Sequence, residues 1–201
     1  MLIAFSGKMA SGKTLSARLL YNMFKDSKFN PKLKSIAKPV YEVTSIITSQ
    51  PIGFVQDNKS SKSKYNLTYR EILQHIGTSF REQFSKEIWL DILFSDNYDP
   101  RKDIIIIDDL RFQNEVDYLK KKGKCFFARV ERFEKPIDTD IVKNIIKEYG
   151  NKNIESSHPS EVDLDNYGVW DTVINNKTDI ESLVLKLNKN IYDPVVNSIK
   201  Q

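Results

Sequence analysis

The feature that most constrains the fold is the sequence GKMASGKT at residues 7–14. It follows a short apolar run, Leu2–Phe5, and precedes a stretch in which leucines and other apolar residues recur at helical spacing. The pattern G-x-x-x-x-G-K-[ST] between a strand and a helix is typical of a phosphate-binding loop. Its glycines let backbone N–H groups turn toward phosphate oxygens, and the N-terminus of the helix adds unpaired donors and a partial positive charge. The chain is therefore predicted to bind a nucleoside triphosphate within a fold that alternates strands and helices.

The residue types in this loop predict ATP and Mg²⁺ as cofactors. We expect Lys13 to reach the β- and γ-phosphates of ATP as a catalytic residue, and the hydroxyl of Thr14 to bind the metal. Lys8, inside the loop, fits a phosphate contact and a solvated lysine equally well. The other residues of the loop that are predicted to bind ATP are Gly7, Ala10, Ser11 and Gly12.

The rest of the chain also alternates predicted strands and helices. Further strands are expected at 33–37, 104–107, 125–130 and 169–174. Helices are expected at 13–24, 39–49, around 116–122, near 139–149 and from 179 onward. A further helix is expected to begin at 69 and to be interrupted at Gly77. A longer amphipathic helix that buries Phe84 and Ile92 is expected to follow it. Residues 56–66 are expected to form a mobile surface loop, and the 191–199 tail to pack on the core or on a partner chain. The alternation predicts an α/β fold with a parallel sheet covered on both faces.

An acidic stretch, Asp108-Asp109-Leu110-Arg111, follows the apolar run Ile104–Ile107. An apolar strand that ends in aspartate is where a phosphate-loop protein holds its Mg²⁺ or polarises the acceptor. Side chains alternate along a strand, so Asp108 and Asp109 cannot both face the site while the chain stays extended. Which of the two faces the metal is left open. Asp108 is the predicted metal ligand, and Asp109 and Arg111 are predicted catalytic residues beside the phosphates.

Composition excludes several classes of protein. The single cysteine, Cys125, cannot form an internal disulfide, and cysteine and histidine lack the spacing of a structural zinc site. No apolar run approaches the roughly 20 residues that span a bilayer, so no membrane partner is expected. The net charge of +4 suits phosphorylated metabolites as well as nucleic acid, and the acidic stretch argues against nucleic acid. We expect a cytoplasmic protein.

Several segments, in the same order along most of the chain, resemble the deoxynucleoside monophosphate kinases of tailed phages, which are related to the wider nucleoside monophosphate kinase group. The stretch D-x-R-F-x-N-E, combined with Q-x-x-G-T and H-x-S-E, makes this resemblance more specific than the phosphate loop alone. The segments are GKMASGKT (7–14), SIAKP (35–39), LQHIGTSFREQF (73–84), DDLRFQNEV (108–116), RVER (129–132), HPSEVDL (158–164) and VINNKTDIESL (173–183).

The resemblance implies the P-loop kinase fold, a single domain over 1–201 with a five-stranded parallel sheet and helices on both faces. Its core would comprise 1–37, 101–132 and 167–201, with a substrate-binding lobe at 38–100 and a lid at 133–166. The residues implied to bind the acceptor are Lys38, Gln74, Thr78, Arg81, Arg111 and Glu115. Arg132 would lie near ATP at the base of the lid, and Asn175 and Asn176 near the adenine. His158, Ser160 and Glu161 would order the lid or contact substrate.

The activity that these observations imply is transfer of the γ-phosphoryl group of ATP–Mg to a deoxynucleoside monophosphate, in host cytoplasm if the protein is phage-encoded. Two alternatives remain at this point. One is a kinase of another phosphorylated small molecule such as phosphomevalonate, and the other is a P-loop NTPase module that acts with nucleic acid. The sequence leaves open the accepted nucleobase, the preference between deoxyribose and ribose, and whether the chain forms a homodimer.

Overall fold

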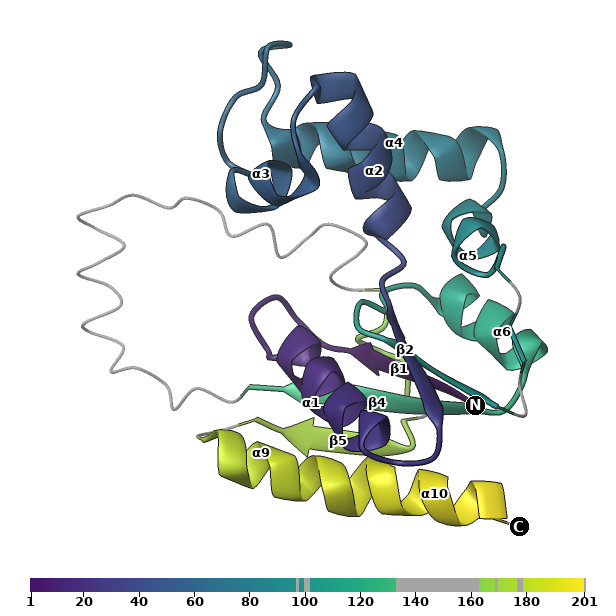
Figure 1. The fold of residues 1–201 in the computed structure, drawn as a ribbon. Coiled ribbons are helices and arrows are strands. Elements are labelled where there is room, and N and C mark those ends of the chain that lie inside the picture. Colours follow the sequence, from purple (N-terminus) through teal and green to yellow (C-terminus); the bar gives the residue numbers. More distant parts are fainter. Residues whose placement is uncertain (97, 100–101, 133–162, 169, 177–178, 201) are drawn as a thin grey trace.

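The computed structural model describes residues 1–96, 98–99, 102–132, 163–168, 170–176 and 179–200. Five parallel strands form one sheet in the order β2-β3-β1-β4-β5 (Figure 1). The strands are β1 (Leu2–Ser6), β2 (Asn30–Lys34), β3 (Asp103–Ile107), β4 (Cys125–Glu131) and β5 (Thr172–Asn175). The prediction of an α/β fold with a five-stranded parallel sheet is confirmed.

Helices cover both faces of the sheet, because its central strands are apolar on both sides. Ile104 and Ile106 of β3 pack with α1 (Lys13–Lys25) and with the C-terminal helices, whereas Ile105 and Ile107 pack with α6 (Gln113–Lys122) and with the helices of the upper layer in Figure 1. All four isoleucines are at most 1% exposed. The predicted central strand is therefore buried on both faces, as the run of isoleucines indicates.

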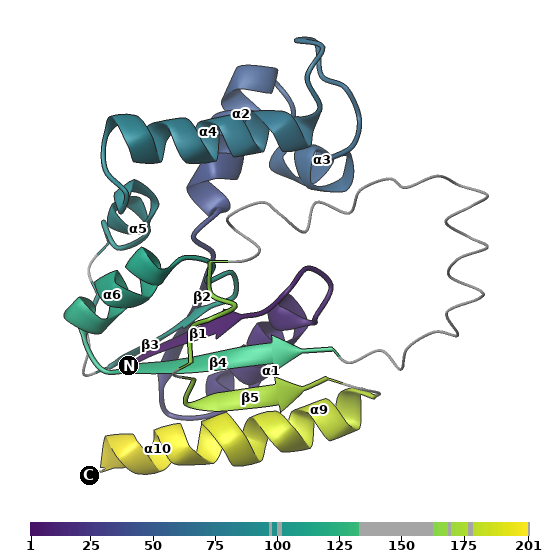
Figure 2. The same ribbon diagram turned by 180° about the vertical axis from the view of Figure 1, so that it is seen from behind.

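A helical lobe, residues 38–93, lies over one face of the sheet (Figures 1 and 2) and shares a hydrophobic cluster with it. It contains α2 (Lys38–Thr48), α3 (Ile52–Asp57), α4 (Tyr69–Gln83) and α5 (Ile88–Leu93). The capping box predicted at Thr68 and Glu71 is present at the start of α4.

The prediction that Gly77 interrupts this helix is wrong, since α4 continues through it. A glycine weakens a helix interior without breaking it. The expected longer helix that buries Phe84 is also absent: the chain leaves α4 after Gln83, and Phe84 is 68% exposed. Ile92 of α5 is 42% exposed, also against the prediction.

Two strands and one loop differ from the predicted bounds. Strand β2 ends at Lys34, and not at Ala37, because the next polar groups bond to an aspartate instead of to the sheet. Strand β5 begins at Thr172. The stretch 56–66 is not simply a loop, because α3 extends to Asp57 and an antiparallel bridge joins Lys62 to Thr68.

The C-terminal segment packs on the chain's own core. It contains α9 (Ile180–Leu187), the π-helical turn η1 (Asn188–Tyr192) and α10 (Asp193–Lys200), which run beneath β5 in Figure 2. Ile191 and Val195 are at most 1% exposed and contact the cluster on the α1 face of the sheet. The predicted helix near 139–149 and most of the predicted lid lie outside the described residues. None of the helices that the structure describes is long and apolar enough to cross a bilayer.

Candidate active site

The turn from β1 to α1 has the backbone geometry that its glycines permit. Gly7 and Gly12 have φ angles of 146° and 99°, and Ala10 has a φ of 61°. A Cβ atom on Gly7 would lie 2.2 Å from the carbonyl oxygen of Val130 in β4. A Cβ atom on Gly12 would lie 2.3 Å from the side-chain nitrogen of Asn176. Both glycines are therefore required by their conformation and by a close neighbour.

Lys13, the first residue of α1, folds back over this turn. Its ammonium group donates to the carbonyl oxygens of Gly7, at 2.5 Å, and of Lys8, at 2.7 Å. The positive charge thus lies beside the backbone amides and the N-terminus of α1, where an anion is favoured electrostatically. A phosphate bound in the loop would contact the Lys13 ammonium group, the backbone amides and the N-terminus of α1.

Asp108 and Thr14 form the second part of the predicted nucleotide site. Burial, and to a lesser extent the charge of Asp109, raise the pKa of Asp108 to about 6, although a hydrogen bond with the Thr14 side chain opposes the shift. One oxygen of this carboxyl, Oδ1, is buried without a hydrogen-bond partner among the described residues. Carboxylate and hydroxyl oxygens are ligands that suit Mg²⁺, which usually takes only one or two from protein and the rest from phosphates and water. The pair fits the predicted metal.

Within the described residues, no three acidic, histidine or cysteine side chains are grouped so as to hold a metal. A site built from Asp108, Thr14 and phosphate oxygens does not need such a group.

Asp109 points away from Asp108, toward the start of the helical lobe. Its Oδ1 accepts a hydrogen bond from the amide of Ile36 at 2.7 Å. Its Oδ2 accepts from the Ser35 hydroxyl at 2.7 Å and from the amide of Ala37 at 2.9 Å. Asp109 therefore fastens the end of β3 to the residues that lead into α2. The two aspartates lie just beyond β3 and have different partners, Thr14 for Asp108 and residues 35–37 for Asp109. This gives Asp109 an anchoring contact, and its predicted catalytic role stays a prediction.

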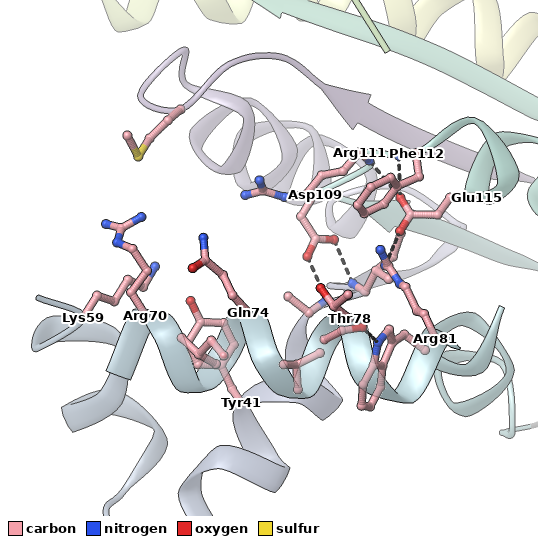
Figure 3. A pocket seen from close by; sticks show the side chains of 17 residues that line it. Tyr41, Lys59, Arg70, Gln74, Thr78, Arg81, Asp109, Arg111, Phe112 and Glu115 are labelled. Carbon is pink, nitrogen blue, oxygen red and sulfur yellow. Dashed lines mark hydrogen bonds and ion pairs between the residues drawn. The ribbon is translucent and has the colours of Figure 1, made fainter. Parts of the chain in front are cut away.

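A cavity of about 300 Å³ lies between the helical lobe and the phosphate loop (Figure 3). One face of α4 lines it at helical spacing, with Arg70, Gln74, Thr78 and Arg81. Met9 of the phosphate loop lines it too, so the two sites adjoin. The remaining lining residues are Ile36, Ala37, Val40, Tyr41, Lys59, Leu73, Gly77, Trp89, Asp109, Arg111, Phe112 and Glu115.

The structure brings together most of the predicted acceptor residues. Gln74, Thr78 and Arg81 of α4 line the same cavity as Arg111 and Glu115, and Arg81 bonds directly to Glu115 (Figure 3). Lys38 does not join them. It lies exposed at the start of α2 and pairs with Glu42 at 3.5 Å, because the rotation of this helix buries Pro39 and Val40 instead.

The residues near the ends of β4 and β5 that were predicted to bind ATP differ in exposure and in their contacts. Arg132 is exposed just after β4, and Asn175 is exposed at the end of β5. Asn176 instead supports the phosphate loop: its side-chain nitrogen donates to the carbonyl oxygen of Ser11 at 2.9 Å, and its backbone amide donates to Glu131 at 2.7 Å. The proposed contact with adenine is not tested by these positions.

Several cavity residues were not predicted from the sequence. Arg70 lies four residues before Gln74, so the helical spacing contained a signal for it. Tyr41, Lys59 and Phe112 come from other segments, and no pattern in the sequence joins them to α4.

Lys8, whose role the sequence left open, forms an ion pair with Asp165. Asp165 also pairs with Arg129 of β4 at 3.0 Å. The residues just before Asp165 are tied to α6, since Asp163 accepts from the backbone amide of Gln113 at 2.7 Å. The phosphate loop is therefore linked by an ion pair to the C-terminal end of the predicted lid. His158, Ser160 and Glu161 lie outside the described residues.

Comparison with known proteins gives one curated relative over nearly the full length. A protein of Acanthamoeba polyphaga mimivirus described as "Putative deoxynucleotide monophosphate kinase" is 27% identical over 198 residues, which cover 89% of this chain and 90% of the relative. No family model matches.

Two solved structures align over nearly all of the chain at low identity. Shikimate kinase from Aquifex aeolicus vf5 is 14% identical, with 98% of this chain and 99% of that chain covered and a TM-score of 0.39. Chaetomium thermophilum Kti12 in complex with ADP-AlF3 is 15% identical, with 96% and 98% covered and a TM-score of 0.40. Both TM-scores are below 0.5, so the assignment of the fold depends on the strand order and register described above and not on these two alignments.

Proposed function

We propose that this chain is a kinase that transfers the γ-phosphoryl group of ATP–Mg to a deoxynucleoside monophosphate, giving a deoxynucleoside diphosphate and ADP. The observation that carries the proposal is the cavity beside the phosphate loop, which is lined by the arginines Arg70, Arg81 and Arg111. A site for a triphosphate alone does not need a second, arginine-lined cavity. The name of the mimivirus relative supports the same substrate class.

The donor end needs charge neutralisation more than covalent chemistry from the protein. The loop amides and Lys13 bind the β- and γ-phosphates and offset their charge. When bound between Thr14 and Asp108, Mg²⁺ supplies further neutralisation of the triphosphate. Asn176 stabilises the conformation of the turn through the hydrogen bond from its side chain to the carbonyl oxygen of Ser11.

The acceptor end is proposed to bind its phosphate next to Arg111 and Arg81, close to the transferring group. The remainder of the acceptor would lie along α4 toward Gln74 and Arg70, which are at the other end of the cavity (Figure 3). A volume of about 300 Å³ is at the lower end of the range for small-molecule sites. The acceptor phosphate is already an anion at neutral pH, so the transfer requires positioning and no strong general base.

The division into core, substrate-binding lobe and lid is part of the proposal. The helical lobe supplies the α4 face of the cavity, which gives it the position expected of an acceptor-binding lobe. Closure over the substrates would exclude water, which otherwise competes as the nucleophile.

The test is a panel of acceptors incubated with ATP and Mg²⁺, with ADP and phosphorylated product both quantified. The panel contains the deoxynucleoside monophosphates, the corresponding ribonucleotides and phosphomevalonate. We expect ADP and a deoxynucleoside diphosphate in equal amounts for at least one deoxynucleotide. Product from phosphomevalonate alone, or ATP hydrolysis that only nucleic acid stimulates, would reject this function in favour of one of the two alternatives.

A further inference from the structure

Glu115 is the most deeply buried charged group of the cavity wall. It is 1% exposed, although the cavity that it lines is open to substrate. One carboxylate oxygen, Oε1, accepts from the guanidinium of Arg81 at 2.7 Å. The other, Oε2, accepts from the backbone amides of Arg111 at 2.8 Å and Phe112 at 3.1 Å. Both oxygens are used within the protein, so direct binding of the acceptor, as the sequence suggested, does not match this geometry.

The partners of Glu115 come from two segments that are far apart in the sequence. Arg81 belongs to α4 of the helical lobe, while Arg111 and Phe112 belong to the loop between β3 and α6. The guanidinium carbon of Arg81 also lies 4.2 Å from the centre of the Phe112 ring, a cation–π distance. Glu115, Arg81 and Phe112 thus form a closed set of contacts that joins the lobe to the core (Figure 3).

This set fixes the two arginines differently. Glu115 holds Arg81 through its side chain and holds Arg111 through its backbone, which leaves the guanidinium of Arg111 on the cavity wall. A single carboxylate therefore contacts both the guanidinium of Arg81 and the backbone from which the Arg111 side chain extends. Transfer of a phosphoryl group depends on such positioning, and displacement of a charged group by about 1 Å has a large effect on rate.

From this geometry we infer that Glu115 is a positioning residue for phosphoryl transfer: it does not touch the acceptor, but sets the separation of Arg81 and Arg111 at the reacting phosphates. The inference rests on the proposed kinase function and deepens it.

The charges around Glu115 add a dependence on pH. The groups that face it are Arg81 from α4, and Arg111 and Asp109 from the loop before α6. Burial raises the pKa of Glu115 to about 7; Arg81 and the two backbone amides oppose this, and Asp109 adds to it. Protonation of Glu115 would remove the ion pair with Arg81. We therefore expect kcat to fall as the pH drops through about 7, beyond the change due to protonation of the acceptor phosphate itself.

The test compares Glu115→Gln with Arg81→Met and with the double variant. The matched control is Glu82→Gln, which makes the same change at an exposed position of α4. Glutamine keeps an acceptor for the amides of Arg111 and Phe112 but loses the charge that holds Arg81. We expect kcat to fall about 10–100-fold, the range for loss of a charge-assisted hydrogen bond, with the KM for ATP nearly unchanged. The low-pH decrease specific to Glu115 should disappear in this variant.

The double variant decides whether Glu115 acts through Arg81. If it does, adding Glu115→Gln to Arg81→Met should change kcat by less than about threefold, since the interaction is already gone. Three results would each overturn the inference. The first is a kcat of the double variant that falls by the full product of the two single-variant effects. The others are an unchanged kcat in Glu115→Gln and a raised KM for the acceptor with normal kcat. Arg81→Met leaves the Glu115 carboxylate buried without its cation, whereas the double variant leaves no unpaired buried charge from these two residues. Should either single variant fail to fold, the double variant is compared with the wild type, and a kcat within about threefold of the wild-type value would overturn the inference.

A second measurement separates this inference from the proposed function. The Nη2 protons of Arg81, which donate to Glu115, should exchange slowly with solvent in the wild-type chain and fast in Glu115→Gln, as followed in ¹H–¹⁵N spectra, whether or not turnover occurs. A wild-type chain that makes no ADP with any acceptor refutes the kinase function. An Arg81 signal that is identical in the two proteins refutes the fixing of Arg81 by Glu115.

Discussion

The phosphate loop and the neighbouring cavity are two binding sites built in opposite ways. The loop is eight consecutive residues whose backbone amides are proposed to do most of the binding, and Asn176 donates a hydrogen bond to it from outside. The cavity is assembled from side chains of several segments, among them the phosphate loop, α2, α4, the loop before α6 and α6 itself, and its two acids, Asp109 and Glu115, bind other protein groups. A contiguous site of backbone groups is visible in sequence, whereas a site of side chains from several segments depends on how those segments pack.

The largest effect should come from Lys13→Ala in the contiguous site. Removal of the ammonium group takes away a charge directed at the transferring phosphates, so turnover should fall on the order of 10²–10³-fold. Circular dichroism and thermal unfolding should match the wild type. Lys28→Ala, an exposed change after α1, is the control. Near-normal kcat in a folded Lys13→Ala protein would contradict the assignment of the loop.

Arg111→Ala tests the other half of the comparison. We expect kcat/KM for the acceptor to fall about 10–100-fold, because a cation beside the acceptor phosphate is lost. Affinity for ATP–Mg, measured by calorimetry, should stay within about twofold of the wild type. If both substrates lost affinity equally, the cavity and the loop would not be separate binding sites.

Asn176→Ala tests the outside support of the loop. Loss of one hydrogen bond to Ser11 is expected to weaken ATP–Mg binding about fivefold, which corresponds to about 1 kcal/mol. Asn176→Asp should weaken it more, because a carboxylate cannot donate and would face a carbonyl oxygen. The role suggested by the resemblance, a contact with adenine, predicts instead an altered preference for ATP over GTP. Binding isotherms with both nucleotides distinguish the two.

The smallest effect concerns the helix that lines the cavity. Gly77→Ala should raise the free energy of unfolding by about 0.5–1 kcal/mol, because alanine is the better helix former. The added Cβ would lie 3.9 Å from Val40, an ordinary contact. Thermal unfolding should therefore show a midpoint about 1–4 °C higher. A lower midpoint would show that the crossing of α2 and α4 requires glycine here.

Some residues of the site could be predicted from the sequence and others could not, for reasons that differ from residue to residue. The loop at 7–14 was identifiable because its function resides in one turn. The resemblance alone indicated Gln74, Thr78 and Arg81, which share a face of α4; the helical spacing of that face also contains Arg70. Tyr41 and Lys59 could not be placed, since they reach the cavity only through the packing of α2 and the turn after α3 against α4.

The roles of the acids were harder to predict than their positions. Asp109 and Glu115 do line the cavity, but the role of a buried carboxylate depends on which groups donate hydrogen bonds to its oxygens. These donors are 34 to 74 residues away in the sequence or belong to the adjoining backbone. Lys38 lies in a segment that resembles the kinases, yet the rotation of α2 turns it outward. Gly77 was misread as a break because local propensity is a weaker determinant than tertiary packing.

The central claim is that the phosphate loop and the arginine-lined cavity bind two phosphorylated molecules whose phosphates meet. The most direct test is calorimetric binding, with Mg²⁺, of a bisubstrate compound in which adenosine and a deoxynucleoside are joined by five phosphates. The account predicts tighter binding than for ATP alone, and weaker binding in both Lys13→Ala and Arg111→Ala. Binding no tighter than ATP, or insensitive to Arg111→Ala, would contradict it.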